Sequence, residues 1–169
     1  MGLFDMFRGD KAETMTPHLA FATSLIYCMG ADGEMDNEEV GHLLSVLGGE
    51  SSGGSIGVGA NNRALLDAAI KYARKNRPDA FLREVSGMLT DAQKICILMN
   101  MIDSALSDGE PEREEQELIN QFQTAFGISD ERFAPFFQAL MIKNDRTVFV
   151  NQSHPANAPG FQVSLATGR

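Results

Sequence analysis

The sequence predicts an all-α fold, a single-domain bundle of about seven helices. Three observations support this prediction. Apolar residues recur at helical spacing along most of the chain, no segment alternates as a half-buried strand would, and capping residues stand where the helices should begin and end. A length of 169 residues favours one domain and is enough to bury a substantial core.

The first predicted helix begins at Thr16, an N-cap residue followed by a proline at the first helical position. It ends at Gly30. A second helix begins near Asp36, which can cap it, and continues to Leu47. The residues expected to be buried in these two helices are Leu19, Ala22, Leu25, Ile26, Met29, Val40, Leu43, Leu44 and Leu47.

Residues 48–60 contain six glycines in thirteen positions, which predicts a flexible Gly/Ser loop. The segment lacks the lysine and hydroxyl residue of a phosphate-binding loop. A third helix is expected from Asn61 to about Asn76, and a fourth begins at Pro78. The side chains expected to be buried here are Leu65, Leu66, Ala69, Ile70, Ala73, Phe81, Leu82, Val85 and Leu89.

Thr90 and Gln93 have the spacing of a capping box at the start of a fifth helix. A sixth helix is expected from Pro111, and Gly127 ends it. The residues predicted to face inward in these helices are Ile95, Leu98, Met99, Ile102, Leu106, Leu118, Ile119, Phe122 and Phe126.

The last predicted helical region begins at Ser129 and reaches about Lys143, with a break expected at Pro135. We expect residues 147–150 to be extended against the domain. The chain is therefore divided into an N-terminal segment (1–14), a helical domain (15–145) and a C-terminal tail (146–169).

The composition excludes several classes of function. The net charge of −9 disfavours binding to nucleic acid and to anionic membranes. No apolar run reaches the length of about 18 residues that spans a bilayer, and no signal peptide is evident, so we expect a cytoplasmic protein without direct membrane insertion. Cys28 and Cys96 lie in apolar helical segments, which favours two buried free thiols.

An acidic stretch occurs twice. Residues 31–39 and residues 107–115 align without a gap at an offset of 76, and each lies between two apolar helical segments. This pattern predicts an internally duplicated unit of helix, acidic turn and helix. The aligned pairs are Asp32 with Asp108, Gly33 with Gly109, Glu34 with Glu110, and Glu39 with Glu115.

The two Asp-Gly-x5-Glu motifs, each following an apolar helix, resemble those of the TerB family of tellurite-resistance proteins. Residues 98–103 and 143–145 add local similarity, and the resemblance covers roughly residues 15–145. It implies a compact helical fold with an acidic surface proposed to bind divalent metal. It also implies a stress-response role beside a TerC-type membrane protein and TerD-type proteins, at the inner face of the membrane through such a partner.

Carried over by position, the resemblance gives Asp32, Glu39, Asp108 and Glu115 as candidate ligands. Glu34 and Glu110 are added because they lie in the same turns. A hard cation such as Ca²⁺, Mn²⁺ or Mg²⁺, weakly bound, suits oxygen ligands of this kind. An EF-hand loop is excluded because Asn37 and Leu43 occupy the positions that require Gly and Glu.

Two other interpretations of the acidic turns remain open. The carboxylates could simply cap the helices that follow them. Alternatively, the acidic turns and the basic segment 63–83 could dock a protein partner without metal. A di-iron site is disfavoured, because Glu39-x-x-His42 has its counterpart in Glu115 and Leu118. No catalytic constellation is present in the sequence, so we expect no enzyme activity.

Overall fold

The computed structural model describes residues 14–30, 41, 43, 45, 62–107, 109 and 111–161. Across these residues the structure is helical and contains no strand, which confirms the all-α prediction. The helices are α1 (Pro17–Met29), α3 (Asn62–Lys75), α4 (Pro78–Val85), α5 (Asp91–Ser107), α6 (Arg113–Phe126), α7 (Asp130–Asn144), α8 (Thr147–Val150) and a 3₁₀ turn, η3 (Pro155–Asn157).

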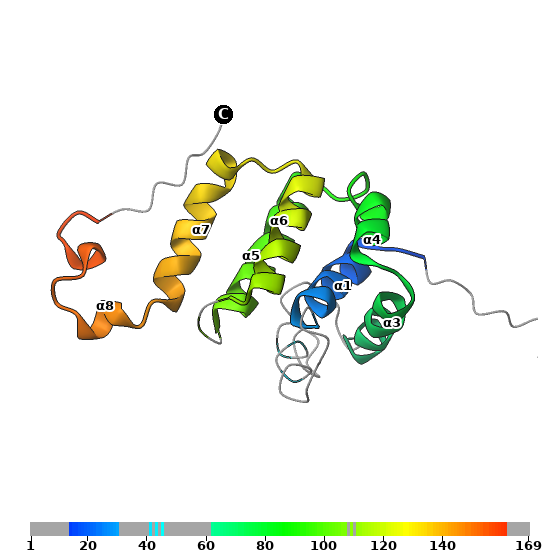
Figure 1. Ribbon diagram of the computed structural model, residues 1–169, viewed down its shortest axis with the longest axis horizontal. Helices are drawn as coiled ribbons and strands as arrows, with labels where there is room; N and C mark the ends of the chain where they lie inside the picture. The colour runs from blue at the N-terminus through cyan, green and yellow to red at the C-terminus, as the bar shows by residue number, and fades with distance from the viewer. Residues whose placement is uncertain are drawn as a thin grey trace, which may run out of the picture.

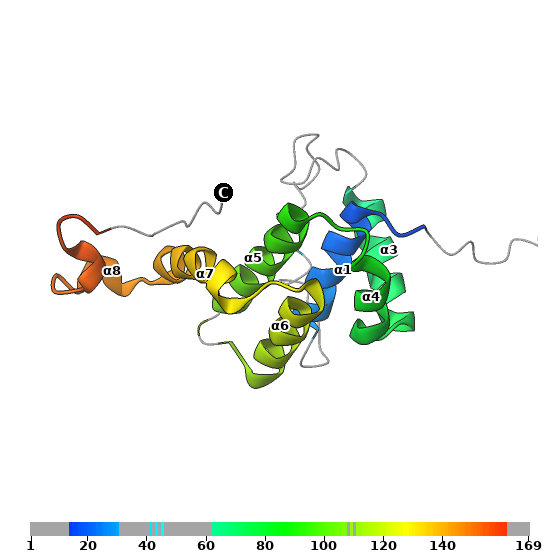
Figure 2. The same cartoon turned by 90° about the horizontal axis from the view of Figure 1, so that it is seen from above.

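Helix α1 runs through the middle of the molecule. It packs against α3, α5 and α6. Helices α3 and α4 lie on one side of it and α5 and α6 on the other, while α7 lies beyond α5 and α8 projects at the far end (Figure 1). The view from above shows the same order, with α7 and α8 extending away from the body (Figure 2).

Every residue of α1 from Leu19 to Met29 is buried. The sequence pattern predicted only one buried stripe. The absence of any charged side chain in this segment was the signal for burial on all sides. Two polar side chains are buried with it. The Ser24 hydroxyl donates to the Ala20 carbonyl oxygen over 2.7 Å, whereas the Thr23 hydroxyl has no hydrogen-bond partner among the described residues.

Aromatic rings connect the helices around α1. The ring of Phe81 in α4 lies 5.4 Å from Tyr27, 5.9 Å from Tyr72 and 5.9 Å from Phe122, centroid to centroid. The Tyr27 hydroxyl donates to the Asn76 carbonyl oxygen over 2.7 Å. Burial, with a smaller effect of the Asp79 charge, raises the pKa of Tyr27 to about 12. These rings therefore join α1, α3, α4 and α6 into one core.

The caps predicted at Thr16, Thr90 and Gly127 are confirmed, whereas α6 begins at Arg113 with Glu112 as its N-cap and does not begin at Pro111. Thr16 accepts from the backbone N–H of Leu19 over 3.1 Å. Thr90 and Gln93 exchange reciprocal bonds of 2.9 and 3.2 Å, which is a capping box. Gly127 ends α6 with φ of 67°, a left-handed conformation that glycine adopts without strain.

Two predictions about the last third of the chain are wrong. Helix α7 continues through Pro135 without a break. Proline at this position removes one bond near the exposed start of the helix, and buried Phe133 and Leu140 hold the helix on the core at both ends. Residues 147–150 form the one-turn helix α8, and they are not extended.

The predicted face of α5 is also displaced. Leu98 and Ile102 are buried as expected, but Ile97, Met101 and Ala105 are buried more deeply than Ile95, Met99 and Leu106, which are half-buried. Helix α5 packs against α1, α6 and α7, so its buried arc is wider than a single stripe. Cys28 of α1 is buried as predicted, whereas Cys96 of α5 is exposed, which corrects the second cysteine assignment.

The proposed duplication stays a prediction. At the offset of 76, Leu25 matches Met101 and Ile26 matches Ile102, and all four side chains are buried. The first acidic turn, most of the second predicted helix and the loop 48–60 lie outside the described residues. Leu43, which is described, is fully buried.

Replacing Phe81 by alanine should destabilise the protein strongly, because the fully buried ring contacts three other rings. We expect a loss of about 3–5 kcal/mol in the free energy of unfolding, measured by urea denaturation. The same substitution at exposed Phe161 serves as the control and should change stability little. Equal effects of the two substitutions would show that the core is not centred on Phe81.

Candidate functional site

The structure describes one of the six carboxylates that the sequence predicts as metal ligands. This residue is Glu115, in the first turn of α6. The other five lie outside the described residues, and nothing in the structure tests them: Asp32, Glu34, Glu39, Asp108 and Glu110.

Glu115 takes part in capping α6. Its Oε2 atom accepts a hydrogen bond of 2.9 Å from the backbone N–H of Glu112, the residue that precedes the helix. The side chain is half-buried. The capping interpretation left open by the sequence therefore holds for this carboxylate, which lies at the positive end of the helix dipole.

Glu115 also lies close to the end of α1. Burial, followed by the negative charge of Glu115, raises the pKa of the Cys28 thiol to about 12. Gly30 lines a cleft of about 510 Å³ together with Glu114 and Glu117 of α6. The residue immediately before the first acidic motif thus lies beside the helix that carries the end of the second motif.

No group of three or more His, Cys, Asp or Glu side chains that could hold a metal ion occurs in the part of the chain that the structure describes. Glu115 alone is not a ligand set. The other candidate ligands lie outside the described residues.

Asp103, at the end of one segment that carries the family resemblance, joins α5 to α7. Its two carboxylate oxygens each lie 2.6 Å from Lys143 Nζ, and its Oδ1 accepts from Asn144 Nδ2 over 2.9 Å. Residues 98–103 and 143–145 are thus brought together in space. Asp103 is neutralised by a lysine and serves a structural role.

Asp145, the last residue of the segment 143–145, orients the chain after α7. Its Oδ1 atom accepts from the backbone N–H of Thr147 over 2.8 Å and from the Thr147 hydroxyl over 2.6 Å. Its Oδ2 atom lies 2.8 Å from His154 Nε2. These contacts, the Thr147 hydroxyl first, hold the pKa of Asp145 below its ordinary value.

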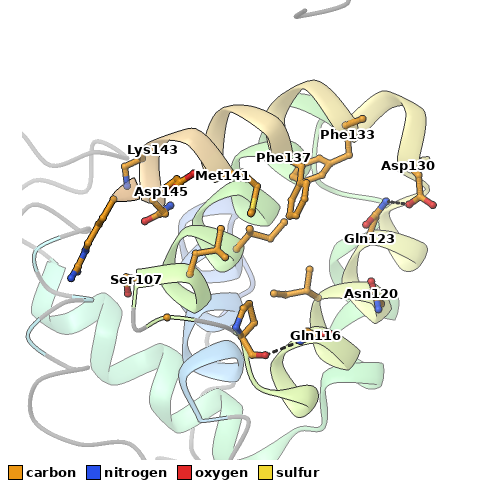
Figure 3. Close-up of a pocket in the computed structure, with 18 of the residues that line it drawn as sticks. Ser107, Gln116, Asn120, Gln123, Asp130, Phe133, Phe137, Met141, Lys143 and Asp145 are labelled. Atoms are coloured by element: carbon orange, nitrogen blue, oxygen red, sulfur yellow. Dashed lines mark hydrogen bonds between the residues drawn. The ribbon is translucent and has the colours of Figure 1, made fainter. Parts of the chain in front are cut away.

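A groove of about 1210 Å³ lies between α6 and α7, with α5 behind it (Figure 3). Polar side chains of α6, including Gln116 and Asn120, form one wall, and Phe137 and Met141 of α7 point into it from the other. The groove was not predicted from the sequence, which gave no inward-facing residues for this helix. The available signal was the apolar series Phe133, Ala134, Phe137 and Met141.

The second acidic turn borders this groove. Ser107, Gly109 and Pro111 lie at one end, near the end of α7, where Arg146 and Thr147 also line the groove. Gln116 Nε2 donates to the Pro111 carbonyl oxygen over 2.7 Å and fixes the chain where it enters α6. The described residues of the second acidic turn therefore line one end of the groove.

The basic segment predicted at residues 63–83 lies on α3 and α4 and is partly neutralised. Arg63 pairs with Asp67 over 3.3 Å, and Arg83 pairs with Asp79 over 3.2 Å. The exposed Arg74 lines the same cleft as Glu114 and Glu117. Acidic and basic side chains thus line one cleft at the end of α1.

The fold and these surfaces define a small helical module with an acidic turn and an adjoining apolar groove. The family described as "Tellurite resistance protein TerB" matches residues 18–136, and the chain belongs to this family. No curated protein and no solved structure matches the chain significantly. Across the described residues, no helix is both long and apolar enough to span a bilayer.

Replacing Thr147 by valine should raise the pKa of Asp145, because the hydroxyl makes the largest contribution to lowering it. A carboxyl whose folded-state pKa is lowered stabilises the fold fully above its ordinary pKa, and this contribution disappears as the pH falls through the folded-state value. The variant should therefore lose part of the pH dependence of unfolding at acidic pH. An NMR titration of the Asp145 carboxyl measures the shift, and an unchanged pKa would contradict the geometry.

Proposed function

We propose that this TerB protein is a non-enzymatic module of a tellurite-resistance stress system that responds to divalent cations through its two acidic turns. The observation that carries the proposal is the position of Glu115. It lies at the start of α6, within electrostatic reach of the last turn of α1, from which the chain enters the first acidic motif. The family match supports the link to tellurite resistance.

The high density of carboxylates around the second acidic turn is the physical reason for expecting a bound cation. Residues 103–117 contain seven acidic residues, of which Asp103 pairs with Lys143 and Glu117 with Arg113, and the other five lie within residues 108–115. Capping one helix requires only one or two carboxylates, each contributing about 0.3–1 kcal/mol. The remaining charges repel one another, so an oxygen-seeking cation such as Ca²⁺, Mn²⁺ or Mg²⁺ would relieve this repulsion. The ligands would be Asp32, Glu34 and Glu39 in one turn and Asp108, Glu110 and Glu115 in the other.

The partners follow from the family resemblance. We propose TerC-type membrane proteins and TerD-type proteins, with this protein in the cytoplasm and recruited to the inner face of the membrane by such a partner. In this scheme the bound cation reduces the negative charge of the acidic turns. The partner then binds a surface of different charge.

The second candidate is a docking scaffold that uses its acidic and basic faces without metal. The observation that favours it is the cleft lined by Arg74 of α3 and by Glu114 and Glu117 of α6, because exposed positive and negative side chains share it. The two functions differ in their response to ions. A scaffold should show only salt-like screening, whereas a cation site should saturate.

Replacing Asp32 and Asp108 by asparagine should abolish most of the cation response, because asparagine keeps the turn chemistry and removes the charge. Isothermal titration calorimetry with Ca²⁺ and with Mn²⁺ measures binding. Thermal unfolding should show a rise in the midpoint for the wild type at cation concentrations far below the NaCl needed for the same shift. The variant should fold as the wild type does.

The matched control replaces Asp67 and Asp91 by asparagine. These exposed aspartates pair with Arg63 and Arg132 outside the acidic turns, so this variant also loses two negative charges. It should keep the saturable binding. Equal loss in the two variants, or no saturable binding by the wild type at millimolar cation, would reject the metal function and favour the scaffold.

A further inference from the structure

The groove between α6 and α7 is large enough to receive side chains from another molecule. Its volume of about 1210 Å³ exceeds the range of about 300–1000 Å³ usual for small-ligand pockets. Phe137 and Met141 at its wall are each 43% exposed, so α7 leaves apolar surface uncovered along the groove. A surface of this kind usually marks an interaction site.

The same chain carries an apolar projection beside this groove. Phe149 is 93% exposed and Val150 is 80% exposed, the two highest values for large apolar side chains in the described residues. Both belong to α8, which stands away from the helical body beyond α7 (Figures 1 and 2). Two exposed apolar side chains on a projection are available for burial in an interface.

Hydrogen bonds hold this projection in place. Asp145 accepts from the backbone and the hydroxyl of Thr147 at the start of α8. Asn157 Nδ2 donates to the carbonyl oxygens of Val148 and Asn151 over 2.8 and 3.1 Å. Phe149 is therefore presented from a braced turn, which lowers the entropic cost of binding.

Within one chain the projection does not fill the groove. Arg146 and Thr147 line the end of the groove, yet Phe149, two residues further on, is almost fully exposed. The braced start of α8 thus directs the aromatic ring away from the groove of its own chain.

We propose that two copies of this chain associate about a two-fold axis that passes between Arg146 and the acidic turn, each placing Phe149 and Val150 in the groove of the other. A two-fold interface requires one patch that is complementary to itself, and this patch contains both the projection and the groove.

The charges at the groove end agree with this arrangement. Exposed Arg146 and the acidic turn, which includes Gly109, Pro111 and exposed Glu112, lie at the same end of the groove. Two-fold symmetry brings Arg146 of one copy against the acidic turn of the other, so the pairing is attractive at both ends.

Sedimentation velocity of the full chain, from micromolar to submillimolar concentration and with a chelator present, tests the association. The wild type should form dimers. Replacing Phe149 or Phe137 by aspartate should weaken association about tenfold or more, because a large apolar side chain loses its buried position. Met88, 37% exposed and outside the groove, provides the control, and Met88→Asp should leave the dimer unchanged.

A mixing experiment separates this arrangement from general apolar adhesion. A heterodimer of Phe149→Asp and Phe137→Asp retains one intact projection in one intact groove. The mixture should therefore associate more tightly than either variant alone. Circular dichroism should show that both variants fold, since both side chains are partly or fully exposed.

A wild type that stays monomeric at submillimolar concentration overturns the proposal, as does a dimer that is unaffected by Phe149→Asp or a mixture without recovery. Because the chelator removes divalent cations, these outcomes leave the cation function to its own test.

Discussion

The structure depends on one constraint, that helix α1 must be covered on every side. Eleven consecutive residues from Leu19 to Met29 are buried, and none of them is charged. An isolated helix would expose all of these apolar side chains to water, which is unfavourable. This segment is therefore stable only if other helices surround it. Helices α3, α5 and α6 supply that cover.

Covering α1 explains where the functional surfaces lie. The helices that pack directly on it bury most of their apolar faces, whereas α7 packs mainly on α5. The groove between α6 and α7 is the result, because no described element covers the outer apolar side of α7 there. The packing of α6 on α1 also brings Glu115 near Cys28, so the core sets the environment of the acidic turn.

Much of this fold could be predicted from local signals. The caps at Thr16, Thr90 and Gly127 were predictable, because their chemistry depends on residues three or four positions away. Continuation through Pro135 and the wider buried arc of α5 were not, since both depend on packing between distant helices.

The candidate site was less predictable than the fold. Two acidic motifs at matched spacing pointed to the turns, but no local pattern places Glu115 beside α1 or Asp103 beneath Lys143. The groove was missed for the same reason. The sequence pattern of the apolar residues of α7 is the same whether another helix of the chain or a separate partner covers them.

Paramagnetic broadening of backbone NMR signals by substoichiometric Mn²⁺ tests the central claim most directly, because broadening depends steeply on distance from the ion. The account predicts selective broadening around Gly30, Glu114 and Glu115, where the end of α1 meets the start of α6. The signals at the starts of α1 and α5, a full helix length from the acidic turns, should be least affected. Uniform weak broadening, or broadening centred on acidic residues away from the two turns, would contradict it.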